Sequence, residues 1–255
     1  MLDIRKNTPD LILTVTPSET EIQLAQAEID RLRQLNHSLL KRVGHELGSP
    51  LTLVLAYLRL WQEQGGIQAL QELDLVLEQA LALKSRLSDL VLLEQIETGR
   101  WRILPKAFPL TLLAERVLEK YNERLLAKRL SVQLALECNL PVLVDEELIF
   151  RVIEHLLSNA IKFSDAGTEI LLATRGEGGL CRLTVADQGP GISQEQLALI
   201  FAPFYQLDVS LTRRYNDTGL GLKFVRAIVE GHGGQLQVES YPGKGSAFSI
   251  VLPLA

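Results

Sequence analysis

The chain has 255 residues, enough for one large domain or two small ones, and its 47% hydrophobic and 22% charged residues exclude a disordered, collagen-like or disulfide-stapled protein. A formal net charge of −5 argues against a nucleic-acid partner, which normally requires a basic surface. Two cysteines are too few for a metal cage and favour a reducing, cytoplasmic location, and no apolar stretch is long enough to span a membrane.

Residues 19–99 predict an all-α helical hairpin with a glycine pair at its turn, after an N-terminal segment, residues 1–18, without a clear fold. A heptad pattern over residues 22–43 includes Asn36 and predicts a parallel two-stranded coiled coil; an amphipathic helix packed within its own domain is the alternative. The return helix is expected from Gln68 to Ile96. One hairpin cannot bury both apolar stripes, so two copies are expected to form a four-helix bundle, which makes the chain a homodimer.

His45 lies where the heptad pattern becomes irregular. Gly44, Gly48 and Pro50, three weak helix formers, surround it. His45 comes just after the last regular heptad position, so its side chain is expected to face solvent. This accessible, loosened helix distinguishes it from His37, an ordinary surface histidine.

Residues 100–255 mix strand and helix patterns and predict an α/β (α+β) sandwich with one layer of helices on a sheet. Strands are expected at 130–136, 169–174, 180–186, 235–239 and 247–252, and helices at 110–128, 146–163 and 220–231.

One helix of this second half carries a polar stripe. His155, Asn159 and Lys162 share a face by steps of four and three residues. An amide and an ammonium on one face suit a ligand made of metal and phosphate; a solvated helix face is the alternative.

Two glycine-containing segments follow. Asp187 stands at a strand end, and glycines 189 and 191 permit the backbone to approach a flat or anionic ligand, although an ordinary turn also has this pattern. Residues 201–217 form a candidate mobile lid, and residues 218–222 open a helix whose N-terminus can hold phosphate. No Walker motif is present, which excludes a P-loop.

Taken in this order, the segments resemble the transmitter of bacterial sensor histidine kinases. In that family a dimerisation and phospho-acceptor hairpin precedes an ATP-binding domain of the gyrase-like ATPase superfamily. The resemblance rests on six segments in family order: the H box at 45–51, the N box at 155–163, the first glycine box at 187–192, the F box at 201–205, the second glycine box at 218–222 and a final glycine turn at 243–246.

The resemblance implies an ATP-dependent protein histidine kinase that autophosphorylates His45 and passes the phosphoryl group to an aspartate in the receiver domain of a response regulator. His45 is the implied nucleophile. Glu46 is implied to act as general base or to orient the ring, and Ser49 to position water when the partner is dephosphorylated. Residues 1–18 hold no recognisable sensor, which leaves room for a separate sensor subunit.

ATP and Mg²⁺ are the implied cofactors. Asn159 is implied to ligate Mg²⁺, Lys162 to neutralise phosphate charge, and Asp187 to accept a hydrogen bond from the adenine amino group. Six further residues are implied to close under the base or to let the lid fold over the triphosphate: Gly189, Gly191, Thr218, Gly219, Leu220 and Gly221.

The chain departs from the family pattern in four places: Gly48 and Gln206 stand where arginine is common, His155 replaces the usual first asparagine of the N box, and Asn216-Asp217 replaces a glycine pair before Thr218. His155 could ligate metal, alter the base role or merely pack. Two other functions remain as alternatives: a non-transferring dimeric signalling scaffold, and a gyrase-like ATPase or serine kinase.

Overall fold

The computed structural model describes residues 51, 52, 54–56, 58, 68–98, 100–202, 205 and 219–255. All of them belong to one compact unit, Glu46–Ala255. The predicted coiled coil, His45 with its surroundings, and most of the predicted lid lie outside the described residues.

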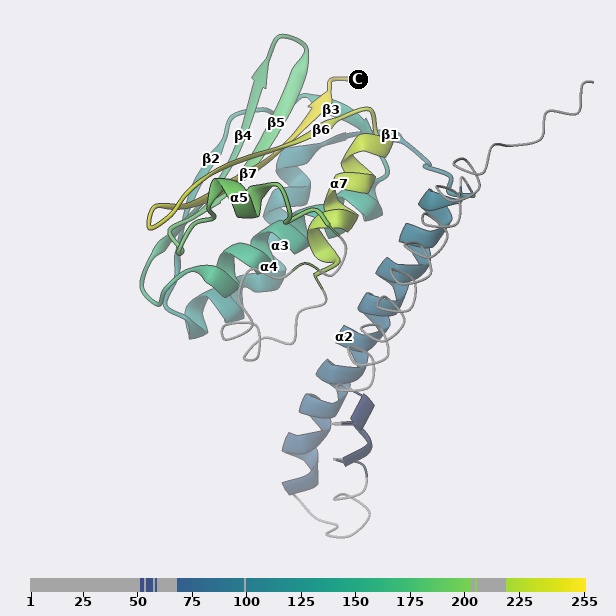
Figure 1. Cartoon of the computed structure of the whole chain (residues 1–255), viewed down its shortest axis with the longest axis vertical. Coiled ribbons are helices and arrows are strands. Elements are labelled where there is room, and N and C mark those ends of the chain that lie inside the picture. The colour runs from purple at the N-terminus through teal and green to yellow at the C-terminus, as the bar shows by residue number, and fades with distance from the viewer. Residues whose placement is uncertain are drawn as a thin grey trace, which may run out of the picture. The chain divides into compact units, whose positions relative to one another are not determined.

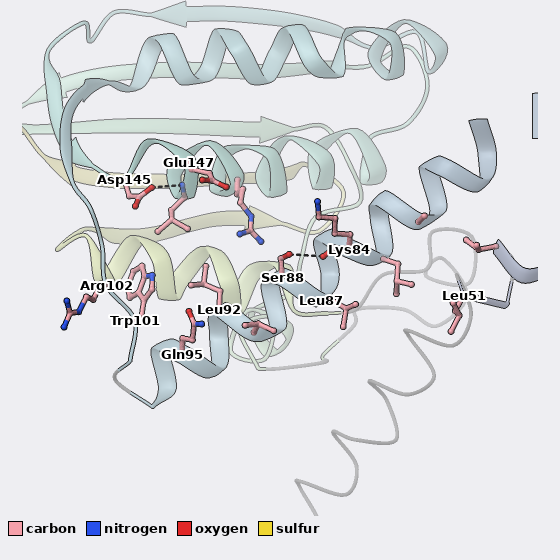
Figure 2. Close-up of a pocket in the computed structure, with 16 residues that line it drawn as sticks. Leu51, Lys84, Leu87, Ser88, Leu92, Gln95, Trp101, Arg102, Asp145 and Glu147 are labelled. Atoms are coloured by element: carbon pink, nitrogen blue, oxygen red, sulfur yellow. Dashed lines mark hydrogen bonds between the residues drawn. The ribbon is translucent and has the colours of Figure 1, made fainter. Parts of the chain in front are cut away.

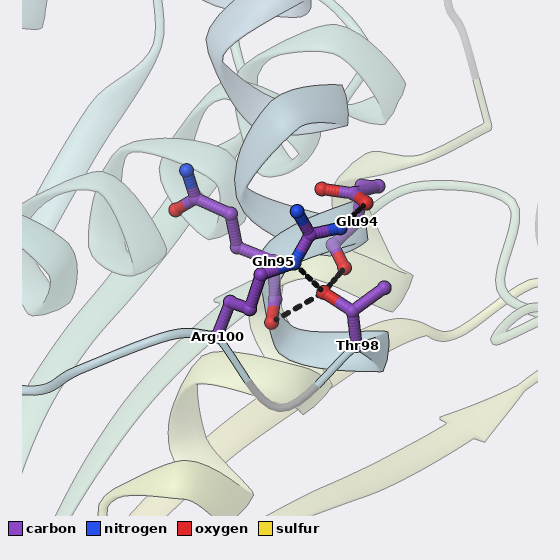
Figure 3. Close-up of polar contacts among 4 residues, drawn as sticks. All are labelled: Glu94, Gln95, Thr98 and Arg100. Atoms are coloured by element: carbon purple, nitrogen blue, oxygen red, sulfur yellow. Dashed lines mark hydrogen bonds and ion pairs between the residues drawn. The ribbon is translucent and has the colours of Figure 1, made fainter.

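Helix α2, Gln68–Glu97, is the predicted return helix. Polar contacts close its last turn, as Figure 3 shows. Thr98 Oγ1 donates to the carbonyl of Glu94 at 2.9 Å, while Arg100 donates from Nε to Thr98 Oγ1 at 3.0 Å and pairs with the Glu94 carboxylate at 2.6 Å. The backbone N–H of Thr98 also donates to the carbonyl of Glu94, and those of Arg100 and Trp101 donate to the carbonyl of Gln95, so backbone and side chains together close the helix end. The helix therefore ends here, in agreement with the predicted boundary.

The remaining described chain is built on a five-stranded sheet with helices on one face (Figure 1). The strand order is β2-β4-β5-β7-β6, with β2 and β4 parallel and the other neighbouring pairs antiparallel. The strands are β2 (Ser131–Leu136), β4 (Glu169–Glu177), β5 (Leu180–Asp187), β6 (Gln235–Tyr241) and β7 (Gly245–Pro253). A separate two-stranded sheet pairs β1 (Lys106–Pro109) with β3 (Pro141–Val144).

The helical layer consists of α3 (Leu110–Ala127), α4 (Glu146–Phe163) and α7 (Gly221–Gly231), and a short helix α5 (Gln194–Leu197) follows β5. Helix α4 packs between α3 and α7 and contributes seven buried apolar residues to the core: Ile149, Val152, Ile153, Leu156, Leu157, Ala160 and Ile161. On the sheet, β4 and β5 bury every second side chain against this layer. The predicted sandwich is confirmed.

Both ends of α4 are held by side chains. Asp145 is the N-cap, and its carboxylate accepts the backbone N–H of Leu148 at 3.3 Å. At the other end, the ammonium of Lys128 donates to the carbonyls of Ile161 at 2.7 Å and Lys162 at 2.9 Å. A cation at the carboxyl end of a helix also complements the helix dipole. Side-chain hydrogen bonds therefore hold α4 at both of its ends.

None of the helices in the described part of the chain is both long and apolar enough to cross a membrane.

His232 joins the end of α7 to the start of α4. The backbone N–H of Asp145 donates to His232 Nε2 at 2.9 Å, so this nitrogen carries no proton. His232 Nδ1 then carries the proton and donates to the carbonyl of Ile228 at 2.7 Å. Burial lowers the pKa of His232, opposed by smaller raising effects of the Ile228 carbonyl and Asp145. The neutral ring is therefore part of the folded structure.

We expect the free energy of unfolding to decrease as the pH drops below about 6.5, the ordinary pKa of histidine. Because the pKa of His232 is lower in the folded than in the unfolded chain, the unfolded chain binds the proton first. The contribution of the neutral His232 ring to the free energy of unfolding is fully present above about pH 6.5 and is lost as the pH falls through the pKa that His232 has in the folded chain. Urea denaturation at a series of pH values measures this loss. His232→Gln, whose neutral amide can accept the same N–H, should show a shallower pH dependence, and equal slopes would contradict the prediction.

Candidate functional site

Helix α4 presents the predicted polar stripe next to its buried face. His155, Asn159 and Lys162 are each partly exposed, whereas Leu156 and Ala160 are buried. The predicted division of α4 into a polar and an apolar face is confirmed. Since the carbonyl of Lys162 is tied to Lys128, the carboxyl end of this stripe is held in place.

Asp187 ends β5 with one carboxylate oxygen already engaged. Its Oδ1 accepts the backbone N–H of Gly189 at 2.8 Å and that of Ser246 at 3.3 Å. Burial raises the pKa of Asp187 above its ordinary value, and these two hydrogen bonds partly offset the rise. Both N–H groups bind Oδ1, so Oδ2 is the oxygen that these two contacts leave open. The carboxylate predicted at this strand end is present, and Gly189 of its own loop and Ser246 of β7 orient it.

Gly189 and Gly191 bring the loop after β5 against other parts of the chain. A Cβ at Gly189 would lie 2.7 Å from the carbonyl oxygen of Phe163, at the end of α4. Gly191 has φ +69°, and a Cβ there would lie 2.0 Å from the carbonyl oxygen of Tyr241. The packing of the chain on itself therefore requires glycine at both positions. This requirement is separate from the predicted approach of the backbone to a ligand.

The second glycine box begins helix α7 beside α4. Gly219 has φ +65°, Leu220 is buried, and α7 starts at Gly221. A Cβ at Gly221 would lie 3.2 Å from Nδ1 of His155. The start of α7 is thus in contact with the polar stripe of α4, where its N-terminal amides can bind phosphate.

His155 contacts a third helix. Its Nε2 lies 3.2 Å from Oδ2 of Asp89 in α2, and its ring centroid lies 5.0 Å from that of Phe224 in α7. Arg151 of α4 pairs with the other oxygen of Asp89. His155 thus packs against Phe224 and pairs with Asp89, and the roles left open for it stay predictions. Sequence reasoning did not single out Asp89; a lone acidic residue within the apolar run of residues 87–93 is the signal that could have indicated it.

The described segments of the predicted site all border α4. The loop of Asp187 touches its carboxyl end, and the start of α7 touches its middle. The site thus combines a carboxylate acceptor, an amide oxygen, an ammonium group and a helix N-terminus. Such a set suits a ligand with a hydrogen-bonding base at one end and phosphates at the other. His45, Glu46, Ser49 and Thr218 lie outside the described residues.

A hollow of about 730 Å³ lies elsewhere, between α2 and the start of α4 (Figure 2). Leu51, Leu87 and Leu92 line it from the hairpin, and Asp145 and Glu147 from the start of α4. Its lining is mainly apolar and contains none of the predicted nucleotide ligands. It therefore lies apart from the predicted nucleotide site, where α2 faces the start of α4.

The fold and these contacts are those of an ATPase domain. Residues 144–255 match the family of histidine kinase-, DNA gyrase B- and HSP90-like ATPases. Circadian input-output histidine kinase CikA of Synechococcus elongatus is 33% identical over 221 residues, which cover 84% of this chain and 29% of CikA.

Solved structures agree with this relationship. Histidine kinase AdeS of Acinetobacter baumannii superposes with a TM-score of 0.65 at 28% identity, covering 82% of this chain and 98% of that chain. Full-length ShkA in complex with AMPPNP has a TM-score of 0.65 at 27% identity, covering 86% of this chain and 46% of that chain. The predicted resemblance to a sensor histidine kinase transmitter is thereby confirmed, and protein histidine kinase is the enzyme class these relatives support. The chain spans less than a third of the length of CikA.

Proposed function

We propose that this chain is an ATP-dependent protein histidine kinase that phosphorylates its own His45 and passes the phosphoryl group to an aspartate of a response regulator. The observation that carries the proposal is the convergence on α4 of the Asp187 loop and the start of α7, within a domain of the ATPase family. The bound nucleotide analogue of the similar kinase ShkA supports ATP as the ligand.

Asp187 would select the base. Its Oδ1 is occupied by the backbone N–H groups of Gly189, in its own loop, and of Ser246, in β7, so Oδ2 accepts from the amino group of adenine. The fixed orientation of the carboxylate matters because a hydrogen bond to a charged acceptor contributes about 1.5–3 kcal/mol. The loop of Gly189 and Gly191, packed on α4 and β6, forms the floor below the base.

Asn159 and Lys162 would hold the metal and the phosphates. Mg²⁺ keeps several waters and is usually bound by one or two protein oxygens together with substrate phosphates. The amide oxygen of Asn159, on the same helix face as the Lys162 ammonium, fits that need. When bound, Mg²⁺ neutralises charge on the phosphates. Gly219, Leu220 and Gly221, with Thr218, complete the phosphate end at the start of α7.

The transfer itself needs two bond changes. A neutral ring nitrogen of His45 attacks the γ-phosphorus; the nitrogen–phosphorus bond forms as the bond to the β–γ bridging oxygen breaks, and ADP leaves. Glu46 accepts the proton from the other ring nitrogen or orients the ring. The phosphoryl group then moves to the carboxylate of the receiver domain: the nitrogen–phosphorus bond breaks, an oxygen–phosphorus bond forms, and the ring takes back one proton, which regenerates neutral His45. Ser49 serves a separate reaction: it positions the water that removes the phosphoryl group from that partner.

The exposed face of α2 supports a homodimer. Leu77, Leu81, Leu87 and Val91 are 43–55% exposed on this helix. Leucines and valines at such spacing form an apolar stripe that a second hairpin would cover in a four-helix bundle. The dimer would bring two acceptor helices and two ATP-binding domains into one assembly.

The test is incorporation of label from γ-labelled ATP with Mg²⁺ into the full chain. We expect acid-labile, alkali-stable label on the wild-type protein, no detectable label on His45→Gln, and unchanged ATP binding by that variant. His37→Gln is the matched control, because it removes a histidine from the same predicted helix, and it should be labelled normally. Acid-stable label would favour a serine kinase, phosphate release without label a simple ATPase, and neither activity a signalling scaffold.

A further inference from the structure

A buried carboxylate connects the hairpin helix α2 to the nucleotide site. Asp89 is only 5% exposed, although its neighbours Leu87 and Ser88 in α2 are exposed. A charge in such a place is costly unless it is paired and hydrogen-bonded. Arg151 binds its Oδ1, and Nε2 of His155 lies 3.2 Å from its Oδ2. Both partners lie on α4, the helix that carries Asn159 and Lys162.

The two partners of Asp89 are held differently. The guanidinium of Arg151 also stacks over the ring of Phe224, 4.8 Å from its centroid, so two contacts keep it in place. His155 makes a longer contact with Asp89, and its side chain is 26% exposed. If His155 turned away, Asp89 would keep Arg151 and no buried charge would be left unpaired. Of the two contacts of Asp89, the one with His155 is therefore the one that another acceptor can replace at low cost.

The alternative acceptor for His155 lies close by. His155 precedes Asn159 by one helical turn on the same face, a rise of about 6 Å. Its ring also touches Gly221, where helix α7 begins. The ring thus lies between Asp89 and the two elements to which the proposed function assigns the phosphates. An imidazole N–H donates equally well to a carboxylate or to a phosphate oxygen, and both bonds are charge-assisted.

We propose that His155 is a positioning residue for which Asp89 of α2 and the phosphates of a bound nucleotide compete. The inference rests on the proposed function, because it assumes that ATP binds with its phosphates at Asn159 and Gly221. Competition is reciprocal: phosphate that takes His155 loosens α2, and any movement of α2 that withdraws Asp89 releases His155 and tightens the binding of ATP. The hairpin and the nucleotide site are thereby coupled through one side chain.

The experiment compares ATP with adenosine, which has the same base but no phosphates. In Asp89→Asn the amide oxygen can still accept from Arg151, whereas the amide nitrogen faces the His155 donor and no longer holds it. We expect calorimetry with Mg²⁺ to show ATP binding about fivefold tighter or more, with adenosine affinity unchanged. Glu94→Gln is the matched control, because it removes a negative charge from the exposed side of α2; it should change neither affinity.

His155→Phe provides the second arm and keeps the ring against Phe224. It should weaken ATP binding several-fold without affecting adenosine, and Asp89→Asn should have no further effect in that background. Equal changes for ATP and adenosine, or the same gain with and without His155, would overturn the inference. Labelling of His45 tests the proposed function separately: a wild-type chain that binds ATP and is labelled, but shows no Asp89 effect, refutes the coupling alone.

Discussion

Asp187→Asn is expected to reverse the base preference of the nucleotide site. An asparagine can keep Oδ1 as acceptor for the N–H groups of Gly189 and Ser246, which places its amide nitrogen where the free carboxylate oxygen was. That nitrogen donates, and so does the amino group of adenine. Two opposed donors replace a charge-assisted hydrogen bond, so ATP affinity should fall by about a hundredfold.

The same change should favour guanine, whose oxygen at the corresponding ring position is an acceptor. Calorimetric titration of ATP and GTP into the wild-type and variant chains measures both shifts. Asp165→Asn is the matched control: Asp165 is exposed beyond the end of α4, so it removes one negative charge without touching the base. A parallel loss for ATP and GTP would mean that Asp187 supports the fold of the loop and does not read the base.

Periodic elements were predictable because their patterns depend on local packing. Helix α4 was expected at 146–163 and spans Glu146–Phe163, since an acidic N-terminus and a continuous apolar face mark it clearly. The strands of the main sheet were predicted to within a few residues. Strands β1 and β3 and helix α5 were missed: each has four residues, and prolines stand at the ends of both strands.

The site was predictable in its residue types but not in its contacts. Asp187 was expected at a strand end, yet its orientation depends on Ser246, 59 residues away. Gly189 was assigned to ligand approach, whereas its closest constraint is the carbonyl of Phe163. Asp89 meets His155 and Arg151 only after the chain has folded through β1, α3, β2 and β3. Contacts of such sequence separation leave no periodic signal.

A substitution in the final glycine turn, at Gly245, is expected to cause a large loss of stability. Gly245 has φ +85°, and a Cβ there would lie 1.9 Å from the backbone oxygen of Asp187, closer than any real contact. Ser246, the next residue, donates its N–H to the Asp187 carboxylate. A methyl group at position 245 must therefore push apart the ends of β5 and β7 at the point where the base-reading carboxylate is oriented.

Gly245→Ala should lower the free energy of unfolding by about 3 kcal/mol or more, from the clash and the left-handed backbone together, and should weaken ATP binding in whatever fraction remains folded. Gly243→Ala is the matched control in the same turn. Its φ is +77°, but a Cβ there meets nothing within 4 Å, so only the backbone cost of about 1 kcal/mol applies. Urea denaturation followed by circular dichroism gives both values. If the two variants lost equal stability, the approach of Gly245 to Asp187 would carry no energetic weight, and the close fit of β7 against the Asp187 loop would not be what orients the carboxylate.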